Sequence, residues 1–249
     1  GGKSSDSAHQ SEHTLIAAFL PILYPATVAE IIEYGLFGWA MSRYSGCYVA
    51  LKCVTDTLDL TATIELPDPH REFALPTDIV LPPEGLNLRP NLPPLVEEDG
   101  LVNHRLPAAT AFARANGIDR IVIDGPRRTL AIVSAGKAYL DLRQALADLG
   151  LDEAACARLG IRVYKPALIW PMDRERLITF AQDSAAVLVV EEKRPVMEDQ
   201  VARHLYAIDA ARRPALTGKQ DLQGAPLLPL AGELGVAQVR QAIRRLLDQ

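Results

Sequence analysis

The segment Ala186-Val187-Leu188-Val189-Val190 is an unbroken apolar run of strand-forming residues. A strand that is apolar on both faces must be covered on both faces, as in a parallel sheet that lies between helices. Further strand-type runs at 129–133 and 161–165 alternate with segments whose apolar residues recur at helical spacing. The sequence therefore predicts an α/β fold with a mostly parallel sheet.

The distribution of proline divides the chain into three regions. Region 67–105 contains eight prolines and few periodic apolar positions. Because proline fixes φ and removes a backbone donor, this region is expected to be extended and irregular. We interpret it as a Pro-rich linker that lies over the surface between region 1–66 and region 106–249, with a disordered tether as the alternative. Four apolar residues favour docking: Ile79, Leu81, Leu86 and Leu88.

In region 1–66 the expected order is strand, helix, strand, which favours a parallel sheet. Thr27 and Glu30 have the spacing of a capping box at the start of the helix. The expected elements are a strand at 20–24, a helix at 27–43, and strands at 48–54 and 60–66. The apolar residues expected on the buried face of that helix are Val28, Ile31, Ile32, Leu36, Trp39 and Ala40.

Region 106–249 alternates between strand and helix patterns. A hairpin is expected at 124–127, where an Asp-Gly pair lies between two strand-type runs. The expected strands are 120–123, 129–133, 161–165 and 186–190. The expected helices are one that begins at Pro107 and ends before Gly117, and those at 138–149, 173–182, 195–208 and 236–247.

Composition argues against several classes of protein. The net charge of -5 argues against a nucleic-acid partner. No apolar run approaches the roughly 20 residues that span a bilayer. The chain has three cysteines, an odd number without a C-x-x-C pair, which favours a reduced, cytoplasmic protein and argues against a zinc or iron–sulfur site within it.

Two loops follow predicted strands and are weak candidates for binding. Ser134, Gly136 and Lys137 lie between a strand and a helix, where an anion could be held by backbone amides. The spacing of a phosphate-binding loop is absent, so a structural turn is the alternative. Glu191-Glu192-Lys193-Arg194 follows the most apolar strand, where the charges indicate either a site or a solvated strand end.

The chain begins without Met, and residues 1–13 are nearly all small, polar or ionisable. Such a run suits either a loop around a polar ligand or a disordered terminus. Its densest part is His9-Gln10-Ser11-Glu12-His13. The H-E-x-x-H order of a zinc protease is absent, so no metal is expected there.

Several segments resemble the indolepyruvate:ferredoxin oxidoreductase family, in its long fused bacterial form. They occur in consistent order at 2–13, 34–47, 112–124, 133–141 and 189–194. The resemblance implies that residues 1–66 are the later part of a thiamine-type pyrimidine domain. It also implies that residues 106–249 form a three-layer α/β/α domain similar to the C-terminal domain of transketolase.

The family resemblance implies an enzyme that oxidatively decarboxylates aryl pyruvates to acyl-CoA, with ferredoxin as electron acceptor. Its cofactors would be thiamine diphosphate with Mg²⁺ and an iron–sulfur cluster. The other expected partners are the remaining domains of the same enzyme and a second copy of the chain. The resemblance places five residues in the substrate and cofactor cleft: Ser4, Ser5, His9, Gln10 and Glu12.

The sequence lacks the G-D-G motif and the cofactor-activating glutamate that the family carries. We therefore expect an internal fragment that is inactive alone and binds no cofactor alone. The alternative is a non-catalytic module, similar to the transketolase C-terminal domain, for dimerisation or small-molecule sensing. Region 1–66 favours the enzyme, because a freestanding sensor has no need of a partial thiamine-type domain.

Overall fold

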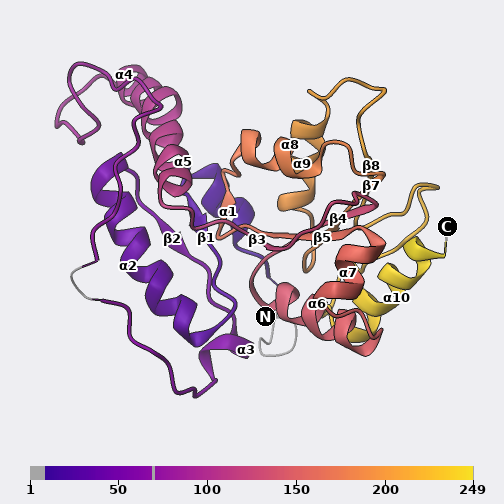
Figure 1. The fold of residues 1–249 in the computed structure, drawn as a ribbon. Coiled ribbons are helices and arrows are strands. Elements are labelled where there is room, and N and C mark those ends of the chain that lie inside the picture. The colour runs from indigo at the N-terminus through magenta and orange to yellow at the C-terminus, as the bar shows by residue number, and fades with distance from the viewer. Residues whose placement is uncertain (1–8, 69–70, 249) are drawn as a thin grey trace.

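The computed structural model describes residues 9–68 and 71–248, and a five-stranded sheet lies at its centre (Figure 1). The strand order is β3-β5-β4-β7-β8, and all neighbours are parallel except the antiparallel pair β3 and β5. The mostly parallel α/β fold is thus confirmed. The strands are β3 (Arg120–Ile123), β4 (Leu130–Ser134), β5 (Ile161–Lys165), β7 (Ala186–Val190) and β8 (Ala215–Thr217).

Helices cover both faces of this sheet. Ile132 and Leu188 point into one core, and Val133 and Val189 point into the other, so alternate residues of β4 and β7 serve opposite layers. This is why the apolar run of β7 is unbroken. On one face lie α6 (Gly136–Asp148), α7 (Glu153–Leu159) and α10 (Val236–Leu247), and on the other lie α8 (Arg174–Ala181) and α9 (Met197–Leu205) (Figure 1).

A second, three-stranded sheet has the order β2-β1-β6. Its strands are β1 (Ile22–Leu23), β2 (Ala50–Leu51) and β6 (Leu168–Trp170). The helix α2 (Val28–Ser45) connects β1 to β2, and the two strands are parallel, as the strand-helix-strand pattern predicts. The third strand, β6, is antiparallel to β1 and was not expected.

Contacts join region 1–66 to region 106–249. The ring of Phe112 on α5 (Leu106–Ala115) lies 5.3 Å from that of Phe37 and 5.1 Å from that of Tyr44, centroid to centroid. One apolar core contains residues of both regions. The division into domains at 66 and 106 stays a prediction.

The irregular conformation expected for region 67–105 is found in its described part up to residue 93, and its role as a linker between domains stays a prediction. Residues 59–68 and 71–93 form neither helix nor strand. The strand expected at 60–66 is therefore wrong. Leu60 and Leu66 are exposed, and neither belongs to a strand of the two sheets. The end of the linker is helical instead, because Pro94 suits a first helical turn. Here α4 (Pro94–Asp99) runs through a π-helical segment (Gly100–Arg105) into α5.

The hairpin expected at 124–127 is wrong, because β5 lies between β3 and β4. All positions of β4 are buried, as expected for a central strand with a neighbour on each side. Arg120 and Ile121 of β3 are exposed, which is typical of a strand at the edge of a sheet. The connecting loop lies on α7, where a Cβ on Gly125 would come within 3.0 Å of the Ala157 Cα.

The face of α2 that the sequence predicts to be buried is buried only in part, since Val28, Ile31, Ile32 and Ala40 are half-buried. Leu36 and Trp39 are exposed, while Tyr34, Phe37 and Met41 are buried. Both sets have helical spacing, and the aromatic set is the one that packs against α5. The Thr27 cap is confirmed, since its hydroxyl accepts a hydrogen bond from the Glu30 amide at 3.2 Å.

Two short helices complete the described chain, α1 (Glu12–Ala17) and α3 (Thr55–Leu58). Among the described residues, no helix combines the length and apolar character that crossing a membrane requires.

Candidate functional site

Three polar segments that are far apart in the sequence meet at the carboxyl edge of the main sheet. The turn 134–137 follows β4, and the turn 191–194 follows β7, which pairs with β4 in parallel. The N-terminal segment 9–12 lies against the second turn. Ligands of open α/β sheets bind at this edge. All three segments stand out in the sequence, but no local pattern predicts that they meet.

The N-terminal segment is bound to the turn 191–194 by hydrogen bonds between side chains and backbone groups. The Gln10 side chain donates to the Arg194 carbonyl at 2.9 Å and accepts from the Arg194 amide at 3.1 Å. The Lys193 ammonium donates to the His9 carbonyl at 3.3 Å, and Lys193 adopts a left-handed conformation with a φ of 59°. Of the five expected cleft residues, His9, Gln10 and Glu12 thus lie at this edge, while Ser4 and Ser5 lie outside the described residues.

A buried ion pair follows directly along the N-terminal segment. The Lys52 ammonium, just beyond β2, pairs with the Glu12 carboxylate and lies 4.0 Å from the centre of the Tyr24 ring. Burial acts to raise the pKa of Glu12, but Lys52 outweighs it and the pKa is lowered. Burial acts to lower the pKa of Lys52, but Tyr24 and Glu12 raise it above its usual value. Both side chains are therefore charged near neutral pH.

Lys52 and Tyr24 were missed by the sequence analysis. A single Lys after a strand carries no local signal, and Tyr24 reads as part of an apolar strand. Their role becomes visible only when β1 and β2 pair and bring Lys52 over the ring. Lys52 and Glu12 line the inner side of the candidate site, and the buried Tyr24 ring packs against the Lys52 ammonium.

The turn 134–137 is engaged in structural contacts. The Ser134 hydroxyl donates to the Val190 carbonyl at 2.9 Å, and the Lys137 ammonium lies 3.0 Å from an Asp141 carboxylate oxygen and bonds the Leu234 carbonyl. Gly136 has a φ of 56°, and the Tyr24 ring lies where its Cβ would be. These contacts favour the structural turn over an anion-binding loop, and anion binding stays a prediction.

Glu191 has a structural role that the sequence analysis did not assign. Its buried carboxylate accepts hydrogen bonds of 2.9 to 3.1 Å from the amides of Val196, Met197 and Glu198, at the start of α9. Burial raises the pKa of Glu191, and these amides act in the opposite direction. A carboxylate shortly before an expected helix start, which Pro195 marks, is the signal that could have indicated this cap.

The hollows at the site are small. Residues 9–12 together with Lys52, Cys53, Val54 and the turn after β7 line a hollow of about 60 Å³. A second hollow of about 210 Å³ lies between His9, Gln10, the turn 191–194 and residues 230–232. Both are below the roughly 300 Å³ at which ligand pockets begin. The part of the chain that the structure describes also contains no group of three or more His, Cys, Asp or Glu that could hold a metal.

Comparison with protein families finds one model in the second half of the chain. Residues 119–241 match the family "Indolepyruvate ferredoxin oxidoreductase middle domain". The matched segment begins just before β3 and ends within α10. It includes the turns 134–137 and 191–194.

Similar curated proteins are archaeal. "Indolepyruvate oxidoreductase subunit IorA" of Methanothermobacter thermautotrophicus is 26% identical over 98% of this chain and 37% of the relative. The protein of the same name in Archaeoglobus fulgidus is 25% identical over 93% of this chain and 33% of the relative. That of Pyrococcus abyssi is 30% identical over 50% of this chain and 17% of the relative. The chain thus spans about a third of the length of the first two relatives.

Two solved structures are similar in part. "Split gene transketolase, inactive beta4 tetramer" has a TM-score of 0.37 and 24% identity, over 52% of this chain and 41% of that one. A 2-oxoglutarate:ferredoxin oxidoreductase from Magnetococcus marinus has a TM-score of 0.34 and 15% identity, over 66% of this chain and 25% of that one.

Proposed function

We propose that this chain, whose residues 119–241 match the indolepyruvate ferredoxin oxidoreductase middle domain, forms part of an aryl-pyruvate oxidoreductase. The reaction would be oxidative decarboxylation of an aryl pyruvate such as indolepyruvate to the acyl-CoA, with ferredoxin as acceptor. The observation that carries the proposal is the match to an indolepyruvate oxidoreductase subunit over 98% of the chain.

In this proposal the segment 9–12 forms one wall of the cleft for substrate or cofactor, together with Ser4 and Ser5. The polar groups of Gln10 and Glu12 are occupied by Arg194 and Lys52, so their role would be to position the wall. The His9 side chain is exposed and would be the hydrogen-bond donor nearest to a ligand carboxylate. Lys52 and Lys193 would add positive charge on the same side.

Thiamine diphosphate does not fit the described residues by themselves. Its diphosphate is held through a divalent cation, and the described residues offer no cluster for one. The hollow at 9–12 measures about 60 Å³, which is smaller than an ordinary ligand pocket. We propose that other parts of a longer enzyme supply the cofactor contacts and the iron–sulfur cluster. A homodimer, CoA and ferredoxin complete the proposed partners, and the three free cysteines suit the proposed cytoplasmic location.

Calorimetry on the chain alone tests this division of roles. When thiamine diphosphate and Mg²⁺ are titrated into residues 1–249, we expect no binding at micromolar affinity, which is about -8 kcal/mol. The control is a longer oxidoreductase that contains this sequence, for which binding is expected. Micromolar binding by the isolated chain would contradict the proposal that the cofactor contacts lie elsewhere.

A further inference from the structure

Four segments meet at the amino edge of the main sheet, which is the edge opposite the candidate site. They are residues 124–129 before β4, 157–160 before β5, 182–185 before β7 and 206–214 before β8. The Leu130 amide donates a hydrogen bond to the Gly160 carbonyl at 3.0 Å. The Ala185 amide donates to the Arg128 carbonyl, and the Ala215 amide donates to the Ala185 carbonyl, both at 3.1 Å. These bonds join the four segments into one continuous surface.

This surface gathers arginines that are far apart in the sequence. The four segments contain Arg127, Arg128, Arg158, Arg212 and Arg213. All are exposed except Arg213, which is half-buried. The Arg127 guanidinium donates to the Arg158 carbonyl at 3.0 Å, so these two residues are in direct contact. The parallel pairing of β5, β4, β7 and β8 brings the other arginines to the same edge. We call this surface the arginine edge.

The arginine edge is basic, although the chain as a whole is acidic. Its five arginines and three aspartates give a formal charge of +2, against -5 for the whole chain. Two of the aspartates already have partners, since Asp124 pairs with Arg162 and Asp183 pairs with Arg212. Among the residues that the structure describes, the other four arginines of the edge form no ion pair. Their charge is therefore available to a partner.

Two uncharged side chains on the arginine edge suit a contact with a protein. Tyr206 is 77% exposed, and the Arg213 guanidinium lies 4.8 Å from the centre of its ring. Arg213 also donates to the Tyr206 carbonyl at 3.0 Å, which holds the two side by side. Leu159 is 42% exposed beside Arg158. Tyr and Arg are among the residues that carry most of the binding energy in protein interfaces.

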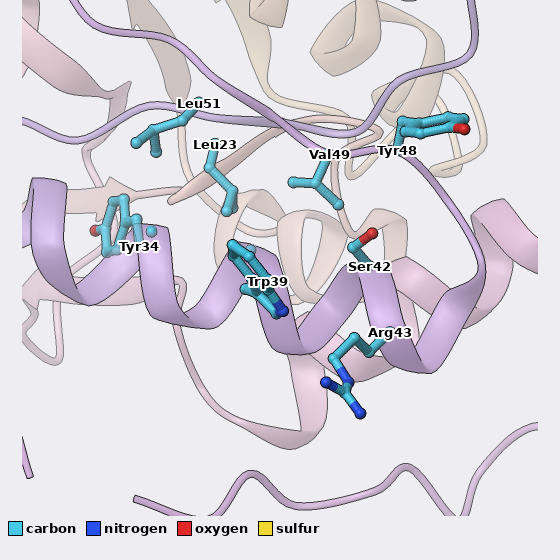
Figure 2. Close-up of a pocket in the computed structure, with 10 residues that line it drawn as sticks. Leu23, Tyr34, Trp39, Ser42, Arg43, Tyr48, Val49 and Leu51 are labelled. Atoms are coloured by element: carbon cyan, nitrogen blue, oxygen red, sulfur yellow. The ribbon is translucent and has the colours of Figure 1, made fainter. Parts of the chain in front are cut away.

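The arginine edge differs from the apolar hollow on the outer face of α2. That hollow measures about 370 Å³, and its lining includes Leu23, Tyr34, Trp39 and Val49 (Figure 2). Permanent protein interfaces are predominantly apolar, whereas transient interfaces are more polar. A charged and mostly polar surface such as the arginine edge therefore suits a partner that binds and dissociates.

We propose that the arginine edge docks an acidic patch on a separate, folded protein in a transient contact. Three strand spacings of about 4.8 Å make the edge about 15 Å long, which matches a patch of a few carboxylates. An extended polyanion, such as a nucleic acid or an anionic membrane, would also meet the acidic remainder of the chain. Local charge complementarity thus favours a protein. The proposal goes beyond the aryl-pyruvate reaction and does not depend on it.

A partner at the arginine edge leaves the candidate site open. The central strands β4 and β7 have five residues each. At about 3.3 Å per residue, the amino and carboxyl edges of the sheet are about 17 Å apart. A docked protein can therefore bind while the carboxyl edge stays accessible.

Fluorescence anisotropy of the full chain with a labelled hexaglutamate peptide tests the proposal. Six extended residues span about 20 Å, close to the length of the edge. In about 50 mM salt we expect saturable binding with a dissociation constant on the order of 0.1 mM. The double variant Arg128→Glu, Arg158→Glu should weaken binding about tenfold or more, because it replaces attraction by repulsion. Neither side chain forms a described hydrogen bond or ion pair, so circular dichroism should match the wild type.

Arg240→Glu with Arg244→Glu is the matched control. It makes the same change of charge at two exposed arginines of α10, outside the arginine edge. It should change the dissociation constant less than about twofold, because charges farther away than the Debye length are screened. Absence of peptide binding, or an equal loss in the two double variants, would overturn the proposal. Either result would leave the proposed aryl-pyruvate function standing.

Oligodeoxythymidines and anionic vesicles test the other classes of partner. A strand of about 24 nucleotides should bind no more tightly per binding register than one of about six, since each additional phosphate meets an acidic surface. Phosphatidylserine vesicles should not retain the chain in a flotation assay. Affinity that rises with strand length, or vesicle binding, would overturn the acidic protein as partner if Arg128→Glu, Arg158→Glu abolishes it.

Discussion

Gly136→Ala is expected to lower the free energy of unfolding by about 4 kcal/mol, combining overpacking with left-handed strain. A Cβ on Gly136 would lie 2.1 to 2.3 Å from three atoms of the Tyr24 ring. The ring is buried between Gly136 and the Lys52 ammonium, so it cannot move without disturbing the ion pair to Glu12. Urea unfolding followed by circular dichroism measures the loss.

Gly150→Ala is the matched control for Gly136→Ala. Gly150 has a φ of 69°, close to that of Gly136, but a Cβ there would meet nothing within 4 Å. Gly150→Ala should lower the free energy of unfolding by about 1 kcal/mol, from backbone strain alone. Equal losses in the two variants would show that the Tyr24 contact is unimportant.

A double-mutant cycle assigns the difference to the ring. Tyr24→Ala removes the atoms that a Cβ on Gly136 would strike, so the losses of Tyr24→Ala and Gly136→Ala should not add. We expect a coupling energy of about 2 kcal/mol between contacting sites. Additive losses would place the effect of Gly136→Ala in the backbone alone.

Glu191→Ala is expected to cost about 3 kcal/mol of folding free energy, since it leaves buried amides without an acceptor. The amides of Val196, Met197 and Glu198 all donate to this carboxylate, and the water that would replace it has little access. Differential scanning calorimetry measures the loss as a lower melting temperature.

The neighbouring Glu192 provides the control for Glu191→Ala. Its half-buried carboxylate accepts one hydrogen bond, from the Leu234 amide at 3.2 Å. Glu192→Ala should therefore cost about 1 kcal/mol, the usual contribution of one hydrogen bond. If Glu192→Ala is as destabilising as Glu191→Ala, the start of α9 does not depend on the Glu191 cap.

Elements with a strong local pattern could be predicted from the sequence, and those set by distant pairing could not. The apolar run of β7 and the amphipathic pattern of α10 are confirmed, as is the Asp173 cap of α8, which accepts from the Arg176 amide at 3.1 Å. The short strands β6 and β8 have no such pattern, because each exists only through the strand beside it. The hairpin failed for the same reason, since β5 comes from 161–165.

The candidate site, like the fold, could be predicted from the sequence only in part. Its three segments could be found separately, because polar residues after strands and a polar N-terminal run are visible in the sequence. Their meeting depends on the parallel pairing of β4 with β7 and on the contact between Gln10 and Arg194. Trp39 is a case in which a local pattern gave the wrong result. Its spacing on α2 predicts a buried residue, but its side chain is exposed.

The most direct test of the proposed function is ferredoxin reduction driven by indolepyruvate. A longer oxidoreductase that contains this sequence should reduce ferredoxin with indolepyruvate, CoA and thiamine diphosphate, and residues 1–249 alone should not. The reaction should also be faster with indolepyruvate than with 2-oxoglutarate. Activity of the isolated chain, or a longer enzyme that oxidises no aryl pyruvate, would contradict the account.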